Sequence, residues 1–303
     1  MFVIYLVLIF IVPFVYAGVI NYIKSLWAGR KGQSIFQPLF DFIKLLKKGE
    51  VISKRTSKIF QVSPVIYFCS VLISSLFIPY GNNVSMISFD GDFIIFMYIL
   101  AIGNFFMILS ALDTGSSFEG MGASREAIFS IFIEPSLFLI FGSFVFLTRN
   151  TNILDILESF NFSNFYSSVV SFMSIVGILM ILVSEGKRVP VDDPQTHLEL
   201  TMIHEVMILD NSGIDLGLIN YATYLKMTVF NAIISSILFI QSGLLFSLIG
   251  FLIVNLFSAI IVGTIESIFA RFKINYIPQW LLTILGISIF IVMIILTNFG
   301  GKI

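Results

Sequence analysis

The residues most suited to charge transfer are concentrated in RVPVDDPQTHLELTMIHEVMILDNSG, which begins at Arg188. Carboxylates and imidazoles take up and release protons, so a cluster of them predicts a proton or ion relay. The two histidines are seven residues apart, which predicts neither a haem nor a zinc site, and HEVMI lacks the second histidine of the H-E-x-x-H motif. With its flanks the stretch contains both histidines and seven of the 18 acidic residues: His197, His204, Glu185, Asp192, Asp193, Glu199, Glu205, Asp210 and Asp215.

Redox centres are expected outside this chain. Cys69 is the only cysteine, so an intrachain disulfide and a cysteine-ligated iron–sulfur cluster held by this chain alone are excluded. We therefore expect no cofactor and no metal site here, and any redox partner to be another chain.

The elements that must position these side chains are membrane helices. Hydrophobic residues make up 57% of the 303 residues and charged residues 12%, against roughly 25% charged in soluble domains. Repeated apolar runs of about 20 residues predict an all-α polytopic protein with one membrane domain over residues 1–303. The eight predicted spans are Phe2–Ile23, Val62–Pro79, Phe93–Leu112, Glu126–Leu147, Tyr166–Ser184, Leu216–Ile240, Leu244–Ala270 and Gln279–Asn298.

Charge asymmetry predicts the orientation in a cell inner or plasma membrane. If the loop after the first span is inside, 14 lysines and arginines fall in inner loops and two in outer segments. By the positive-inside rule both termini face outside, and the acidic loop over residues 185–215 faces the cytoplasm. The net charge of −1 indicates no nucleic-acid partner.

A second element is expected after the first span. In FQPLFDFIKLLKKG, apolar residues recur at helical spacing, Pro38 suits a first turn, and the lysines fall largely on the other side. This pattern predicts an interfacial amphipathic helix over residues 33–49 that contacts lipid headgroups or a soluble partner, the simplest alternative being a plain lipid anchor. Its polar residues are Gln37, Asp41 and Lys44.

Glu134 is the acid that the sequence places deepest in the membrane. It follows Arg125 by nine residues, or roughly 13 Å of helix, and Pro135 beside it predicts a kink. A mid-membrane carboxyl group is costly and is expected to be functional, although a structural carboxylate held by a helix neighbour is the alternative. Lys226 inside the sixth span has either a functional or a structural partner, and Glu266 is expected at a solvated helix end.

Two further predictions concern the inner face. ALDTGSSFEGMGASRE is expected to be a short glycine-rich loop that adds Asp113, Glu119, Arg125 and Glu126 to this face. The acidic stretch predicts a helix over residues 194–211 with Asp193 as N-cap and Gly213 as stop. Glu199 and Asp210 share one side of it, His197 and His204 another, and Glu205 sits apart. Such a helix is expected to line a polar cavity, the alternative being a solvated face.

Three patches resemble one family. They are GRKGQSIFQPLFDFIKLLKK, GASREAIFSIFIEP and EGKRVPVDDPQTHLELTMIHEVMILDNSG. The chain resembles the eight-span membrane subunit shared by respiratory complex I (its subunit 1/H family) and the group 4 energy-converting nickel–iron hydrogenases of the formate hydrogenlyase type. Where complex I members carry E-x-x-R-x-P-F-D, this chain has Val191 before Asp192, which is similar to the hydrogenase branch and puts a quinone site in doubt.

The resemblance implies a non-catalytic coupling subunit that links chemistry in a peripheral arm to H⁺ or Na⁺ translocation. The implied partners are a nickel–iron large subunit, an iron–sulfur small subunit and antiporter-like membrane subunits, and the nickel–iron site and clusters belong to those partners. Three alternatives stay open: a quinone-site subunit of complex I type, a stand-alone transporter and a passive anchor. The expected relay residues are Glu134, Asp113, Glu119, Glu126, Glu185, Glu199, Glu205, Asp210 and Lys226. The expected residues for docking the arm are Arg125, Arg188, Asp192, His197 and His204.

Overall fold

The computed structural model describes residues 2–80, 85–158, 165–192, 202–239, 241 and 243–300, and within them it contains helices and no strand. In these described ranges, eight helices are long and apolar enough to cross a membrane. The prediction of an all-α, eight-span membrane protein is therefore confirmed. The long helices are α1 (Phe2–Trp27), α3 (Lys58–Phe77), α4 (Asp92–Asp113), α5 (Ser117–Thr148), α7 (Phe165–Glu185), α8 (Gly213–Phe239), α9 (Leu244–Ile268) and α10 (Ile277–Gly300).

Helix α8 is the centre of the bundle. It packs against α1, α3, α7 and α9, and 83% of its apolar membrane-spanning stretch is buried inside the protein. This stretch is also less apolar than those of the other seven long helices, with a mean hydropathy of 1.4. Polar side chains such as Lys226 and Asn231 are tolerated on α8 because its neighbours keep them away from lipid.

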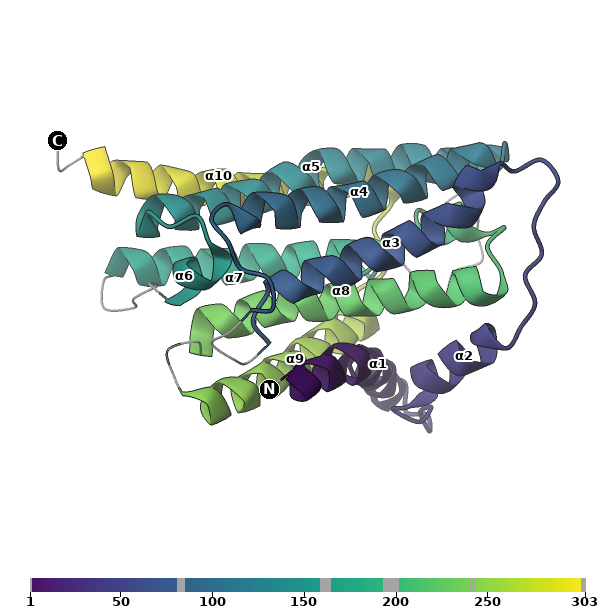
Figure 1. Cartoon of the computed structure of the whole chain (residues 1–303), viewed down its shortest axis with the longest axis horizontal. Coiled ribbons are helices and arrows are strands. Elements are labelled where there is room, and N and C mark those ends of the chain that lie inside the picture. The colour runs from purple at the N-terminus through teal and green to yellow at the C-terminus, as the bar shows by residue number, and fades with distance from the viewer. Residues whose placement is uncertain are drawn as a thin grey trace.

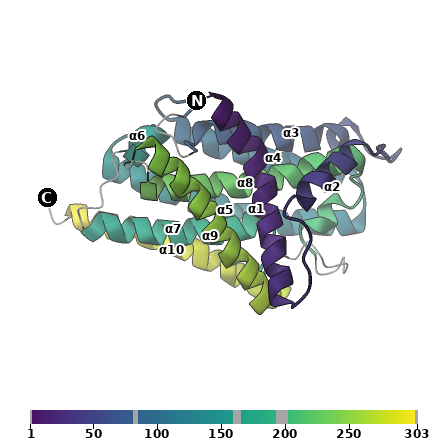
Figure 2. The ribbon, with the colours of Figure 1, turned by 90° about the horizontal axis from the view of Figure 1, so that it is seen from below.

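Figure 1 shows α3, α4, α5, α7, α8 and α10 running roughly side by side, while Figure 2 shows α1 and α9 crossing them steeply. Helices α1 and α9 pack closely on each other. A Cβ atom at Gly263 of α9 would lie 2.9 Å from the Ile23 side chain of α1, so glycine permits this approach.

A helix forms after the first span, as the spacing predicts. Helix α2 (Gln37–Leu46) has proline in its first turn, and Gln37 Nε2 donates to Asp41 Oδ1 at 2.9 Å. Pro38 is buried, while Phe36 and Phe40 are exposed. The helix packs against α8 and α1. Its place at a membrane surface stays a prediction.

The predicted loop before Glu134 is wrong. Only residues 114–116 separate α4 from α5, so Glu119, Arg125 and Glu126 lie on the first turns of α5. Gly115, with a φ of +65°, lies in the short break, whereas Gly120 and Gly122 lie within α5. The acidic loop packs closely at Gly122, where a Cβ atom would lie 2.5 Å from the Val206 side chain. Helix α5 also continues through Pro135, where the predicted kink stays a prediction.

The predicted helix over residues 194–211 is wrong in its described part. Residues 202–204 are not helical, and only a 3-10 turn, η1 (Glu205–Ile208), forms before α8. Side chains from elsewhere bind the backbone groups that an α-helix would use: Asp192 Oδ2 accepts the His204 N–H at 2.9 Å, and Glu119 Oε1 accepts the Asp210 N–H at 3.0 Å. His197 and Glu199 lie outside the described residues.

Gly213 begins α8 and does not end a preceding helix. Its φ is +55°, and a Cβ atom there would lie 2.8 Å from the Gly49 carbonyl oxygen. Both the backbone conformation and the close approach favour glycine. The two short elements that remain are α6 (Ile153–Glu158) and η2 (Ile274–Tyr276).

Candidate functional site

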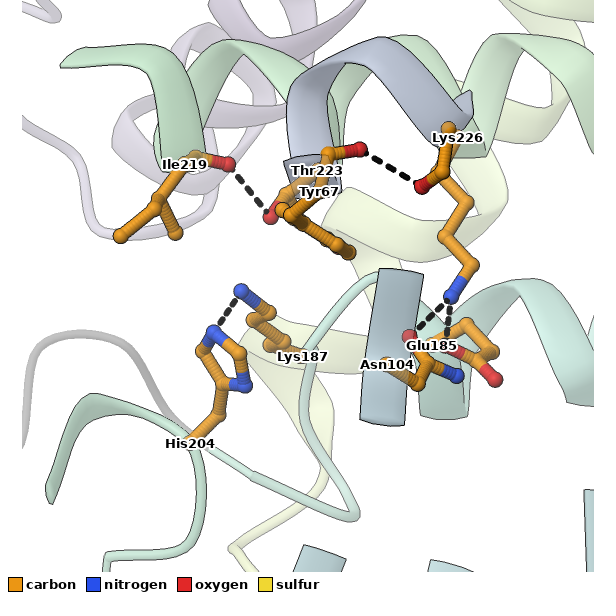
Figure 3. A network of polar contacts seen from close by, with 9 residues as sticks. Tyr67, Asn104, Glu185, Lys187, His204, Ile219, Thr223 and Lys226 are labelled. Carbon is orange, nitrogen blue, oxygen red and sulfur yellow. Dashed lines mark hydrogen bonds and ion pairs between the residues drawn. The ribbon is translucent and has the colours of Figure 1, made fainter. Parts of the chain in front are cut away.

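Lys226 forms the centre of a buried charged cluster (Figure 3). Its Nζ donates to Glu185 Oε2 at 2.5 Å and to Asn104 Oδ1 at 2.9 Å. These partners come from the last residue of α7 and the middle of α4, while Lys226 belongs to α8. Lys226 is 1% exposed, and its ammonium group is stabilised by one carboxylate and one amide oxygen.

Glu134 lies next to this cluster and is half-buried. It lines a small cavity of about 30 Å³ together with Lys226, Glu185 and Asn104, which is room for about two water molecules. It also lines a groove of about 600 Å³ between α4 and α5, where its neighbours include Tyr98 and other mostly apolar side chains. The Glu134 carboxyl group therefore stands between the buried cluster and the outer face of the bundle.

Lys187 forms a second charged contact, on the loop side of the first. It lies in the turn directly after α7, has a positive φ of 57°, and its Nζ contacts His204 Nε2. Burial lowers the pKa of Lys187 to about 7, although the carboxylates of Glu205 and Glu126 oppose the shift. Burial also raises the pKa of Glu205, which the charge of Lys187 opposes. Lys187 can thus change its protonation state near neutral pH.

A polar chamber of about 160 Å³ adjoins Lys187 and has room for several water molecules. It lies among α1, α8 and the loop after α7. Its lining is mainly polar: Asn21, Gly186, Lys187, Arg188, Glu205, Asn220, Thr223 and Tyr224. The chamber could carry water to the Lys187–His204 contact.

Two ion networks hold the acidic loop against the helices. Glu266 on α9 binds Lys24 of α1 at 2.9 Å and Arg188 at 3.4 Å. The Glu266 side chain is fully buried, so the expectation of a solvated helix end is wrong, and the reason is this pairing with two cations. The second network joins Asp192 Oδ1 to Arg271 at 2.8 Å.

Arg188 and Asp192 are 5% and 3% exposed. Within this chain their side chains therefore hold the loop in place and contribute little to its outer surface. Arg125 has a similar place, because its Nη1 donates to the Met202 carbonyl at 2.5 Å. His204 is buried between Lys187 and the backbone contact to Asp192. Their expected role in docking a soluble arm stays a prediction.

Three of the expected relay acids, Asp113, Glu119 and Asp210, make their contacts away from Lys226. Asp113 Oδ2 accepts the Ser57 N–H at 2.7 Å at the start of α3. Glu119 is 1% exposed and binds the Asp210 N–H, while Asp210 itself is exposed. These contacts are suited to holding the inner loops together. The structure therefore brings together Glu134, Glu185 and Lys226, with Glu126 and Glu205 around Lys187.

Several members of the site were missed from the sequence. Asn104 is an amide within an apolar span, which is a usable signal for function. Lys187 adjoins Arg188 in the third patch and could have been included on that ground. Tyr67, whose ring faces the Nζ atoms of Lys187 and Lys226, and Lys24, which pairs with Glu266, carry no local signal, because their contacts arise from packing. In the described residues no group of three or more His, Cys, Asp or Glu side chains is placed to hold a metal ion.

The fold and site together define a multi-pass membrane protein with a charged core beneath a folded acidic loop. The sequence model described as NADH dehydrogenase matches residues 1–297, and the chain belongs to this family, that of complex I subunit 1.

Two relatives come from Escherichia coli (strain K12). Hydrogenase-4 component C is 29% identical over 223 residues, which cover 74% of this chain and 69% of the relative. Formate hydrogenlyase subunit 4 is 25% identical over 282 residues, covering 90% and 91% of the two chains. A chain of the membrane-bound sulfane sulfur reductase, an archaeal respiratory membrane complex, has the same fold, with a TM-score of 0.80, 19% identity, and coverage of 97% and 99%.

Proposed function

We propose that this chain is the membrane-anchor and coupling subunit of a multi-subunit energy-converting hydrogenase or a closely related respiratory complex. In this proposal it links electron transfer in a peripheral arm to H⁺ or Na⁺ translocation. The observation that carries it is the buried arrangement of Glu134, Lys226 and Glu185, with the Lys187–His204 contact on its loop side. Ionisable groups inside a membrane are costly and are retained chiefly for ion or proton movement.

The partners follow from the relatives and from the chemistry of the chain. Subunits of hydrogenase-4 and formate hydrogenlyase are relatives, and we infer a nickel–iron large subunit, an iron–sulfur small subunit and antiporter-like membrane subunits as partners. The nickel–iron site and the clusters would be held by those partners. The acidic loop and α2 would face the cytoplasm and the arm, and both termini would lie outside.

In the proposed path, charge changes at the loop reach the membrane through Lys187 and Lys226. Water in the polar chamber would exchange protons with Lys187, and the small cavity beside Lys226 would connect to Glu134. The groove outside Glu134 would be covered by a membrane subunit, because a carboxyl group that is only partly buried at mid-membrane depth needs a polar neighbour.

The test is Glu134→Gln in the assembled complex. Glutamine keeps the volume and much of the hydrogen bonding but cannot take up a proton or compensate a cation. We expect unchanged assembly and electron transfer and at least a tenfold loss of the ion gradient formed per electron in membrane vesicles. Glu158→Gln is the matched control, since Glu158 is an exposed acid at the end of α6.

Full gradient formation in the intact Glu134→Gln complex would remove Glu134 from the path. Purification of the native protein without partner chains in mild detergent would refute the subunit assignment. Quinone reduction by the complex would instead favour a site of complex I type.

A further inference from the structure

Tyr67 on α3 lies between the two charged contacts of the site (Figure 3). Its ring is 3% exposed. The ring centroid lies 5.8 Å from Lys187 Nζ and 5.9 Å from Lys226 Nζ. These distances fall within the range of cation–π attraction, in which an ammonium group is held by the negative face of an aromatic ring.

The two lysines belong to different parts of the site. Lys187 contacts His204 in the acidic loop, whereas Lys226 pairs with Glu185 among the membrane helices. Because both Nζ atoms lie within 6 Å of one ring centroid, they are at most about 12 Å apart. Among the described residues no hydrogen bond or ion pair joins the two lysines directly, and the Tyr67 ring is the one aromatic group that both Nζ atoms face there.

We propose that Tyr67 is a positioning residue that makes the Lys226–Glu185 pair respond to the charge on Lys187. This role rests on the proposed coupling function and would connect the Lys187–His204 contact to the Lys226–Glu185 pair. With Lys187 neutral, the ring attracts Lys226 alone. When Lys187 gains a proton that enters from the solution through water in the chamber, the ring attracts both ammonium groups while they repel each other, which weakens the hold on Lys226.

Other titratable groups also face Lys187, and the test must separate them from the ring. They are His204, which contacts the Lys187 Nζ, Glu205 of the 3-10 turn, Glu126 of α5, Glu185 of α7 and Lys226 of α8. A change confined to the electron density of the ring leaves all of these charges in place. Fluorination achieves this, because fluorine withdraws π-electron density with little change of shape.

The experiment places phenylalanine, difluorophenylalanine and trifluorophenylalanine at position 67 of the assembled complex. Two pH profiles are recorded: ion translocation per electron, and thermal stability of the purified complex. The π-electron density of the ring favours the charged form of Lys187. Withdrawing that density should therefore lower the midpoint, near pH 7, of both pH profiles. We expect a stepwise shift that totals about half a pH unit, or about threefold in proton affinity. The same series at Phe60, another buried aromatic residue of α3, is the control and should cause no shift.

The inference would be overturned if the pH midpoints of both profiles were the same for all three residues at position 67. So would an assembled Tyr67→Leu complex with the parent profiles, since leucine has no π face. A shifted stability midpoint without any ion gradient would support the role of Tyr67 and count against the proposed coupling function.

Discussion

Replacement of Lys226 by methionine tests whether the buried pair with Glu185 is an energetic centre of the bundle. The Nζ–Oε2 distance is 2.5 Å, and both side chains are largely buried, at 2% and 10% exposure. At an effective dielectric constant of about 20, the attraction between unit charges at this separation is roughly 7 kcal/mol, which the lost hydration of both groups offsets. Removal of Lys226 would leave the Glu185 carboxylate buried without its cation.

We expect Lys226→Met to cost about 3–5 kcal/mol of stability, the range observed when one partner of a buried pair is removed. The assay is thermal unfolding of the purified protein in detergent, in which the midpoint should fall by roughly 10 °C. Lys58→Met is the control, because Lys58 is exposed at the start of α3, and its effect should stay within about 0.5 kcal/mol.

The double variant decides between pairing and separate packing effects. Lys226→Met combined with Glu185→Gln removes both charges, so no uncompensated carboxylate is left. We expect the double change to be less costly than the sum of the single changes by about 3 kcal/mol. Additive effects would refute the reasoning that the two charges stabilise each other.

Two further predictions concern the loop. The pKa of Lys187 is lowered from its ordinary 10.5 to about 7, so between these values the unfolded chain holds a proton that the folded chain lacks. Stability should rise with pH across this window by up to about 1.4 kcal/mol per pH unit, and pH titration of the unfolding midpoint should show a flatter slope for Lys187→Met. Glu266→Gln leaves Lys24 and Arg188 without their shared carboxylate and should cost about 3 kcal/mol, with faster proteolysis of the acidic loop, whereas unchanged proteolysis would contradict a role of Glu266 in holding it.

The sequence was sufficient for the properties that depend on local composition. The eight spans follow from apolar runs, because a helix crossing a membrane must satisfy its own backbone and present apolar side chains along its whole length. The helix at Gln37–Leu46 follows from apolar spacing and the position of Pro38. The sequence also predicts Glu134 well inside a span, and Glu134 lies near the middle of α5, while its depth in a membrane stays a prediction.

Tertiary structure decided the partners of each charge and the form of the acidic loop. Lys226 meets Glu185 from 41 positions away and Asn104 from 122, separations that no helical period encodes. The loop favours a helix by its capping residues, yet Asp192 and Glu119 bind its backbone N–H groups and leave only a short 3-10 turn in its described part. Local spacing reports which residues share one helix face. Contacts between helices depend on how the whole bundle packs, and this packing places Tyr67 between two lysines and buries Glu266 between two cations.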